Sequence, residues 1–532
     1  MQSHQARVRV KEKRIAEGIM TEFNRRHLLY TGAAISALGA LGGCAQETVE
    51  ATPDTPETPD APDLSETPAS YTATPIPDGV EQLSMLANGT ATALSLTQAA
   101  IARSQAAQPL INAVATETYD TALESAETPS DGAFGGVPTF IKDLLDWRGA
   151  QTLYGSRAFE GYIAQSDGEF AKAWRKAGVI SLGKSTSPEM GLISSTEPLV
   201  TGATRNPYDL SRIPGGSSGG AAALVAARVV PFAHASDGGG SIRIPAACCG
   251  LFGLKPSRGA LPISRDSGPV EISVNHAVTL TVRDSAALFA AAEVDLDTDL
   301  PRTGNITEAS TQRLKIAYAP EPTTDATVDA ETRAGLDRTA QLCRDLGHEV
   351  IDFTMPTDGN AFTDAFLLYW AAGAAGFAQQ ASAFTGKPIG PDIVEPWTLG
   401  LAAEFMARQA DMPAAIAYLQ AFEAEYHAWF DQFDVLLTPT VSTVPPKIGS
   451  QAPDGDYDTV RANVLNFAAF TAPMNVSGAA SMSVPLQWSA DGLPIGSMFS
   501  GKRGDDGKLL ALAYELEEAL PWIDRLPTFN PA

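Results

Sequence analysis

Two segments rich in glycine and serine constrain this chain more than any other part of its sequence. The first, residues 214–220, reads Pro-Gly-Gly-Ser-Ser-Gly-Gly. Such a run lets the backbone bend sharply, adopt positive φ or approach another group closely. The apolar run 221–230 that follows predicts a helix. Ser217 and Ser218 are therefore expected where a loop enters a helix, with free backbone N–H groups facing a reacting centre.

The second segment, residues 237–243, reads Asp-Gly-Gly-Gly-Ser-Ile-Arg. Three glycines before Ser241 place consecutive backbone N–H groups around its hydroxyl. Acyl transfer needs such donors, aimed where an oxyanion develops. The segment therefore predicts an acyl-transfer site, although a plain loop would account for either segment taken alone.

Two other interpretations of the first segment are weaker. A phosphate-binding loop would continue into Gly-Lys-Ser or Gly-Lys-Thr, and this one does not. A nucleophile elbow needs a strand directly before G-x-S-x-G, whereas residues 205–214 read as a polar loop. An elbow also needs a later catalytic histidine. The later histidines lie in no recognisable catalytic setting and are expected to be structural or surface residues: His234, His276, His348 and His427.

A serine nucleophile without a histidine needs another base, and a buried lysine can serve. Burial disfavours the ammonium form and so lowers the pKa of the amine. Lys142 is the candidate, because it lies in the apolar, strand-like run 136–143, Gly-Val-Pro-Thr-Phe-Ile-Lys-Asp. Its position alone would not single it out, since most lysines face solvent.

Helices and short apolar strands alternate along the rest of the chain. Strands are expected over residues 179–182, 314–319, 349–353 and 435–437. Helices are expected over residues 97–108, 168–176, 330–346, 361–383 and 399–433. This alternation predicts the α/β class, with a mixed β-sheet flanked by helices. No linker-like stretch follows residue 83, so a single large domain is predicted over residues 81–532.

The N-terminus reads as an export signal. Arg25 and Arg26 precede an apolar stretch that is too short for a confident membrane span and fits the core of a signal peptide. We therefore expect a signal peptide over residues 1–43, with Met20 a better start than Met1. The paired arginines resemble a twin-arginine signal.

The stretch ends in Leu-Gly-Gly-Cys, and Cys44 resembles the lipidated cysteine of a bacterial lipobox. Residues 44–80 then hold many prolines among Thr, Asp and Glu, which predicts a disordered acidic tether. We expect an exported protein on the periplasmic side, held to a membrane by its lipid.

The whole chain carries a formal charge of −25 at pH 7. Such a charge repels phosphate backbones, so a nucleic-acid partner is not expected. The four cysteines have no metal-ligand spacing. The acidic charge supports solubility and carries no specific information about the substrate.

Taken together, the motifs resemble the amidase-signature family. That family combines a Lys in G-x-P-x-x-x-K-D, a G-G-S-S-G-G loop and a D-x-G-G-S-I-R segment. This chain has all three in order, at residues 136–143, 215–220 and 237–243. The flanking pieces at residues 183–191, 250–256, 437–440 and 492–496 also fit. The resemblance covers about residues 83–525.

The resemblance implies an amidase that cuts an amide C–N bond through an acyl-enzyme. In this mechanism neutral Lys142 takes a proton from Ser217, whose peptide bond is expected to be cis. Ser217 in turn takes one from Ser241, the nucleophile. Backbone N–H groups of Gly238, Gly239, Gly240 and Ser241 are expected to bind the oxyanion.

The same resemblance assigns three supporting residues. Ser218 is expected to brace its loop by hydrogen bonding, and Asp237 and Arg243 to hold the oxyanion segment in shape. The reaction is expected to need no metal and no cofactor. Gly238 departs from the family, which more often has Thr or Ile there, so the segment is expected to be more flexible.

Two other functions stay open. One is an A-type subunit of the tRNA-dependent amidotransferase, which the export signal and the acidic charge oppose. The other is a non-catalytic binding protein on the same fold, which the intact Lys142, Ser217 and Ser241 oppose. The partner is expected to be a small-molecule amide, and a homodimer is compatible with the sequence.

The regions 361–383 and 406–433 are expected to shape the substrate pocket, because both are apolar. Phe366, Tyr369 and Trp370 are candidate lining residues. An apolar amide is preferred as substrate. Cyclic or linear oligoamides, peptide amides and aryl amides all fit this description.

Overall fold

The computed structural model describes residues 71–263, 268–293 and 298–529. The predicted signal peptide, the predicted lipidation site at Cys44 and residues 44–70 of the predicted tether lie outside these ranges. The described chain forms a single α/β domain.

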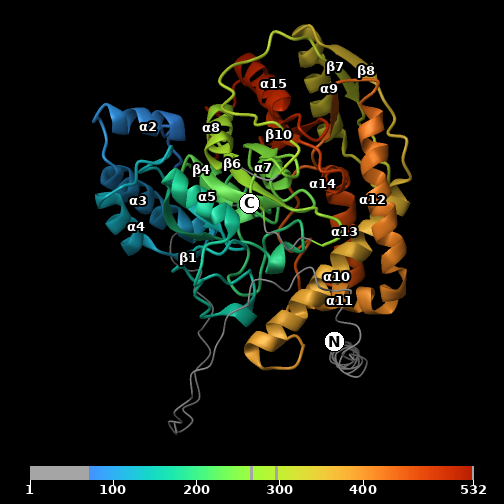
Figure 1. Ribbon diagram of the computed structural model, residues 1–532, viewed down its shortest axis with the longest axis horizontal. Helices are drawn as coiled ribbons and strands as arrows, with labels where there is room; N and C mark the ends of the chain where they lie inside the picture. The colour runs from blue at the N-terminus through green and yellow to red at the C-terminus, as the bar shows by residue number, and fades with distance from the viewer. Residues whose placement is uncertain (1–70, 264–267, 294–297, 530–532) are drawn as a thin grey trace.

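The described residues build a mixed eight-stranded sheet at the centre of the molecule (Figure 1). Its strand order is β4-β6-β5-β10-β11-β9-β7-β8. β7 pairs in parallel with β8 and β9, and the other neighbours are antiparallel. The strands are β4 (Phe232–Asp237), β5 (Phe252–Lys255), β6 (Val274–Thr279), β7 (Lys315–Tyr318), β8 (Glu349–Asp352), β9 (Val435–Pro439), β10 (Ser481–Trp488) and β11 (Pro494–Ser500). The predicted mixed sheet is confirmed.

A second, three-stranded sheet lies beside β4. Its order is β1-β3-β2, with β1 (Val114–Glu117), β2 (Pro138–Lys142) and β3 (Ile180–Ser185). The Thr139 hydroxyl on β2 donates to the Phe232 carbonyl on β4 at 2.9 Å. β2 therefore runs next to the edge of the large sheet, and every residue of β2 is buried.

Helices cover both faces of the large sheet. The α-helices are α2 (Gly79–Ala87), α3 (Ala93–Ile111), α4 (Tyr119–Glu127), α5 (Glu169–Ala177), α6 (Gly219–Ala226), α7 (Arg243–Cys248), α8 (Val282–Ala292), α9 (Ala330–Asp345), α10 (Gly359–Thr385), α11 (Pro396–Arg408), α12 (Met412–Trp429), α13 (Tyr457–Phe467), α14 (Ala472–Val476) and α15 (Asp506–Ala519). Short 3₁₀ turns are η2 (Arg157–Phe159), η3 (Glu189–Gly191) and η4 (Gln409–Asp411).

Strand β9 shows how the two faces are filled. Val435 and Leu437 pack in a core with α8, α9 and α15, whereas Leu436 packs in a core with α10 and α12. Successive side chains of a strand point to opposite faces, so a continuous apolar run is expected for a strand covered on both sides. The apolar run 435–437 is therefore a buried strand, as predicted.

Two predicted boundaries are wrong. The apolar stretch 399–433 is two helices, α11 and α12, separated by η4, and Pro413 stands in the first turn of α12, where proline is favoured because it has no N–H to leave unpaired. The folded part also begins before residue 81. Tyr71 donates to the Ala227 carbonyl at 2.9 Å and Asp78 caps α2. The predicted tether therefore ends earlier than residue 80.

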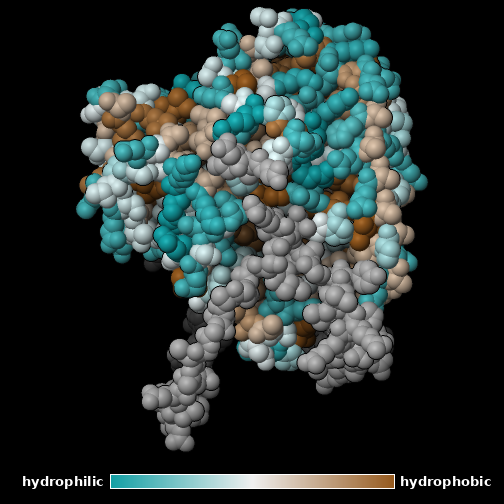
Figure 2. Space-filling view, viewed as in Figure 1, coloured by the Kyte–Doolittle hydropathy of each residue, from teal (hydrophilic) through white to brown (hydrophobic). Residues whose placement is uncertain are grey.

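The surface of the described part is mainly hydrophilic on the face shown in Figure 2. Of the helices in the described ranges, none combines the length and the apolar character that crossing a membrane requires.

Candidate active site

Three segments bring the predicted site residues together. Lys142 is the last residue of β2, Ser217 lies in the loop before α6, and Ser241 lies between β4 and α7. The Lys142 backbone N–H donates to Nδ1 of His234 on β4 at 3.2 Å. This bond fixes the end of β2 against β4, where the lysine side chain reaches Ser217 and Ser236.

The Lys142 amine is fully buried and has three polar neighbours. Its Nζ lies 2.8 Å from Ser217 Oγ, 3.0 Å from Ser236 Oγ and 3.2 Å from the Ser236 carbonyl oxygen. A neutral amine has two N–H donors and one lone pair. The two contacts with Ser236 can take the donors, which leaves the lone pair for the Ser217 hydroxyl proton. Sequence reasoning missed Ser236, although it directly precedes the Asp237 motif.

The surroundings of Lys142 favour the uncharged amine. Burial lowers the pKa of Lys142 to about 7, and the nearby Asp237 carboxylate opposes part of that shift. At neutral pH a large share of the molecules therefore carries a neutral amine that can accept a proton.

Glycines in the Ser217 loop and in η3 beside it are packed too closely to carry side chains. The peptide bond between Gly216 and Ser217 is cis, as expected from the resemblance. A Cβ on Gly216 would lie 2.3 Å from the Ser195 carbonyl oxygen, and one on Gly191 would lie 2.9 Å from Ser217 Oγ. The neighbouring Ser218 hydroxyl lies 3.3 Å from the Ser236 carbonyl and so ties the loop to β4.

Ser241 opens into a cavity of about 610 Å³. Among the described residues, its hydroxyl has no hydrogen-bond partner, and the structure contains no Ser217–Ser241 hydrogen bond. Catalytic hydrogen bonds are often long before substrate binds and tighten in the complex. Gly216, which precedes Ser217, lines the same cavity, so the two serine segments meet there.

Asp237 organises the segment that carries Ser241. Its carboxylate accepts from the backbone N–H of Gly240 at 2.7 Å and of Ile242 at 3.1 Å. Arg243 donates to both carboxylate oxygens at 3.0 Å, and both side chains are fully buried. Burial alone would raise the pKa of Asp237, but Arg243 and Asn475 hold it well below its usual range. Asp237 is therefore a buried anion that shapes the loop.

The Gly240 N–H is not available to an oxyanion, which corrects one predicted donor. The Gly239 carbonyl accepts from the Thr471 hydroxyl. In a trans peptide the next N–H points the opposite way, and that of Gly240 points to Asp237. In the described structure, the N–H groups of Gly238, Gly239 and Ser241 have no hydrogen-bond acceptor. Three of the four predicted donors thus stay free.

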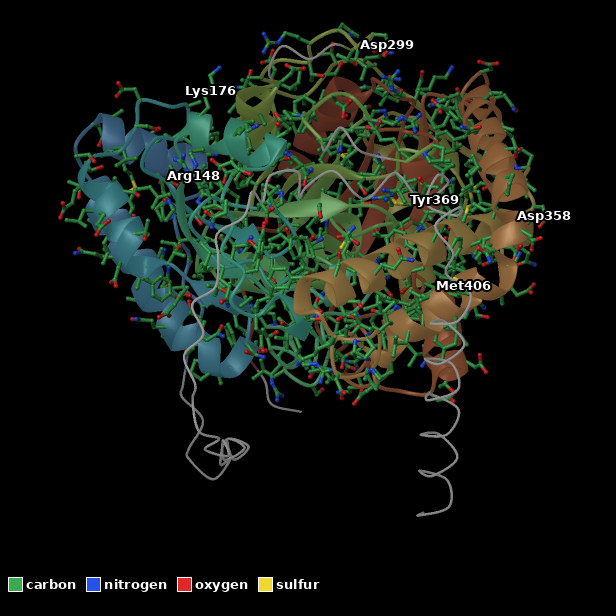
Figure 3. The ribbon with its side chains drawn as sticks, turned by 60° about the horizontal axis from the view of Figure 1, so that its bottom comes forward. Arg148, Lys176, Asp299, Asp358, Tyr369 and Met406 are labelled. Carbon is green, nitrogen blue, oxygen red and sulfur yellow. The ribbon has the colours of Figure 1, made fainter. Side chains whose placement is uncertain are left out.

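Aromatic side chains wall the cavity beside Ser241. Phe366 and Trp370 from α10 line it, as predicted, together with Trp397 and Leu401 from α11. Tyr369, labelled in Figure 3, does not line it, because its hydroxyl donates to the Val270 carbonyl at 2.8 Å instead.

The prediction for residues 406–433 is also wrong. Met406, labelled in Figure 3, is not a lining residue, and neither is any residue of α12. The side chains of α12 pack against α10 and the sheet instead. Helical periodicity identifies these residues as apolar but does not say whether they face a cavity or a core.

The predicted structural role of the histidines agrees with their surroundings at two positions. His234 accepts from the Lys142 backbone, and burial lowers its pKa well below the usual value. His276 is buried, and burial lowers its pKa to about 3. Within the described ranges, no three His, Cys, Asp or Glu side chains are grouped so that they could hold a metal ion.

Comparison with known proteins gives consistent matches over most of the chain. The family model described as Amidase matches residues 95–510. AmiC of Mycobacterium bovis, which is assigned by name as an amidase, is 40% identical over 450 residues, covering 84% of this chain and 95% of that protein. The 6-aminohexanoate-cyclic-dimer hydrolase of a Pseudomonas species (strain NK87) is 33% identical, covering 86% of this chain and 97% of that protein.

Solved structures agree with these sequence matches. The structure of a 6-aminohexanoate cyclic dimer hydrolase complexed with substrate superimposes with a TM-score of 0.79 at 32% identity, covering 85% of this chain and 99% of that one.

Proposed function

From the premise that this chain belongs to the amidase family and is a hydrolase acting on amide bonds, we propose that Lys142, Ser217 and Ser241 carry the reaction as a triad. The observation that supports this most directly is the 2.8 Å contact between Lys142 Nζ and Ser217 Oγ at the end of a buried strand. The cavity that opens at Ser241 supplies the place for the scissile amide.

In the proposed reaction the proton moves first toward the amine. Ser217 gives its hydroxyl proton to neutral Lys142 and takes the proton of Ser241. Ser241 Oγ then forms a bond to the amide carbonyl carbon. The resulting oxyanion accepts from the free N–H groups of Gly238, Gly239 and Ser241.

The second half of the reaction returns the proton. Lys142 passes it through Ser217 to the amide nitrogen, the C–N bond breaks, and the amine leaves. Water attacks the acyl-enzyme ester by the same route and releases the carboxylic acid. Every proton taken up by Lys142 is thereby given back within one cycle.

We also propose an uncharged, largely apolar amide as substrate, because aromatic and aliphatic side chains wall the cavity next to Ser241. Purified protein should hydrolyse at least one member of a panel made of a cyclic 6-aminohexanoate dimer, an acyl anilide and a peptide amide. A Ser241→Ala variant serves as the blank. A folded wild-type protein that neither hydrolyses the panel nor reacts with a fluorophosphonate would point to the binding-protein alternative.

For the N-terminus we propose export and lipidation at Cys44. The support is the apolar stretch after Arg25 and Arg26 and the Leu-Gly-Gly-Cys sequence. Radiolabelled palmitate should be incorporated into the protein in cells and not into a Cys44→Ala variant. A homodimer remains a further proposal, which the mass of the purified protein in solution tests.

The rate should follow the neutral fraction of Lys142. Burial lowers the pKa of Lys142, so the proton is lost as the pH rises through about 7. The value of kcat/KM should therefore increase about tenfold per pH unit below about pH 7 and level off above it. The measurement is kcat/KM against pH, with unfolding monitored at each pH.

Lys255 provides the control for this profile. Burial also lowers the pKa of Lys255 to about 7, but its amine donates to the Pro256 carbonyl and not to either serine. A Lys255→Met variant should keep the inflection near pH 7. If the inflection disappeared in that variant, the pH profile would report the amine of Lys255 and not that of Lys142.

A further inference from the structure

Two aromatic rings from α10 lie against the glycines that precede Ser241. A Cβ on Gly238 would lie 3.2 Å from Oγ of Ser273, 3.3 Å from Cζ3 of Trp370 and 3.5 Å from its Cη2. One on Gly239 would lie 3.3 Å from Cζ of Phe366. The two rings are one helical turn apart, with centroids 5.6 Å apart. The indole and the Ser273 hydroxyl would therefore both crowd a side chain at position 238.

Trp370 is held in this position by a hydrogen bond. Its Nε1 donates to the Leu192 carbonyl at 3.2 Å, and Nε1 of Trp397 donates to the same oxygen at 3.0 Å. Leu192 and both indoles line the cavity. Turning Trp370 away would break its bond and its ring contact with Phe366, so the indole forms a fixed wall.

This wall stands next to the reacting carbon. In the proposed reaction the carbonyl oxygen of the substrate lies at the N–H groups of Gly238 and Gly239. The two rings lie against these glycines and line the cavity, so a group attached to the carbonyl carbon is expected to lie close to them. A branched group has more width than an extended methylene chain or a planar ring. A branched group would therefore bind less favourably beside the two rings, because close-packed side chains move little to make room.

We propose that Trp370 is a specificity-determining residue, which together with Gly238 restricts the enzyme to amides whose carbonyl bears an unbranched or planar group. The inference rests on the proposed function, since it needs Ser241 as the reacting group. It also gives a structural reason for glycine at position 238, because a side chain there would crowd the indole and the Ser273 hydroxyl.

Covalent probes that react with Ser241 test the wall directly, whichever amide is the natural substrate. An unbranched n-alkyl fluorophosphonate and diisopropyl fluorophosphate both place phosphorus where the carbonyl carbon would react. The ratio of their labelling rate constants at Ser241 measures tolerance of branching. Trp370→Ala should shift this ratio toward the branched probe by about tenfold or more, the size expected for one or two methyl groups in an apolar pocket.

Tyr369→Phe is the matched control. It removes the hydrogen bond from the neighbouring residue of α10 to the Val270 carbonyl, but Tyr369 does not line the cavity, so the ratio should stay at the wild-type value. An equal shift in both variants would mean that the packing of α10, and not the width of the wall, controls selectivity, and it would overturn the proposal.

A reciprocal test uses position 238. Gly238→Thr should slow labelling by both probes, and the Trp370→Ala/Gly238→Thr variant should recover part of that rate, because removing the indole makes room for the added side chain. No recovery would contradict the complementarity of the two residues. If wild type reacts with both probes and Trp370→Ala leaves the ratio unchanged, the wall is refuted while the triad stands. If neither probe labelled the wild-type protein, both the proposed triad and the proposed role of Trp370 would be refuted.

Discussion

Replacing Lys142 by methionine should lower kcat at neutral pH by about 10²–10⁴-fold, the range for loss of a general base. Methionine keeps an unbranched side chain of similar length and removes the amine that lies 2.8 Å from Ser217 Oγ. The Ser217 hydroxyl then has no group that takes its proton as Ser241 attacks. The measurement is kcat on a reactive anilide, with circular dichroism and thermal unfolding to show that the protein is folded.

Lys184 offers a matched control for the loss of a buried amine. It is fully buried on β3, and its Nζ contacts the Leu145 carbonyl and the Thr152 hydroxyl, away from the serines. Lys184→Met should reduce stability but keep kcat per folded molecule. A Lys142→Met protein that is folded and still turns over at the wild-type rate would show that another group is the base.

Small amines should partly rescue a Lys142→Ala variant. Shortening the side chain leaves a buried hole lined by the Ser217 and Ser236 hydroxyls, which had contacted the amine. A small primary amine that enters this hole in its neutral form can accept the proton of Ser217. The rescued rate should therefore rise with pH as the added amine loses its proton, a dependence that a purely structural role for Lys142 would not produce.

Arg243→Met should destabilise the protein by about 3–5 kcal/mol, the cost of removing one partner of a buried ion pair. Arg243 and Asp237 are both fully buried, and the guanidinium bonds both carboxylate oxygens. Without it the Asp237 anion keeps its backbone and Asn475 donors but has lost its paired positive charge. The measurement is the free energy of unfolding from denaturant titration, together with fluorophosphonate labelling of Ser241.

The double variant separates the ion pair from simple packing. Asp237→Asn/Arg243→Met leaves no unpaired charge, so it should be less destabilised than the sum of the two single variants. Strictly additive losses would mean that the pair is not coupled in the folded protein. Labelling should fall in all three variants, because the Gly240 N–H bond to Asp237 sets the loop before Ser241.

The sequence predicted those parts of the site that are encoded locally. Lys142, Ser217 and Ser241 each lie in a short motif, and the residues next to them in sequence also form their surroundings in the fold. Thr471 and Asn475 carry no such motif, yet they bond the Gly239 and Asp237 carbonyls across 232 and 238 positions of chain. Contacts at such separation depend on how strands and helices are arranged, which local spacing does not record.

Secondary structure was predicted correctly where a single apolar repeat, helical or strand-like, ran through one element. The helix expected over 361–383 is α10, whereas the apolar period that ran through 399–433 concealed the break at η4. Strands β10 and β11 were not predicted at all, although they lie in the middle of the large sheet. Serines alternate with apolar residues at the start of β10, and two further serines interrupt the apolar run of β11. The hydroxyls of Ser481 and Ser500 bond each other, so these polar side chains are buried as a pair in the core.

The hydrogen bonds from Thr471 and Asn475 to the loop before Ser241 have a consequence for biosynthesis. The ribosome makes Lys142, Ser217 and Ser241 first, but Thr471 and Asn475, which bond the Gly239 and Asp237 carbonyls, follow much later, just before β10 and β11 complete the sheet. A nascent chain therefore carries the proposed nucleophile before it has the side chains that shape the loop in front of it. We expect hydrolysis to begin only near the end of translation, and a polypeptide that ends before Thr471 to be inactive toward the amides around it.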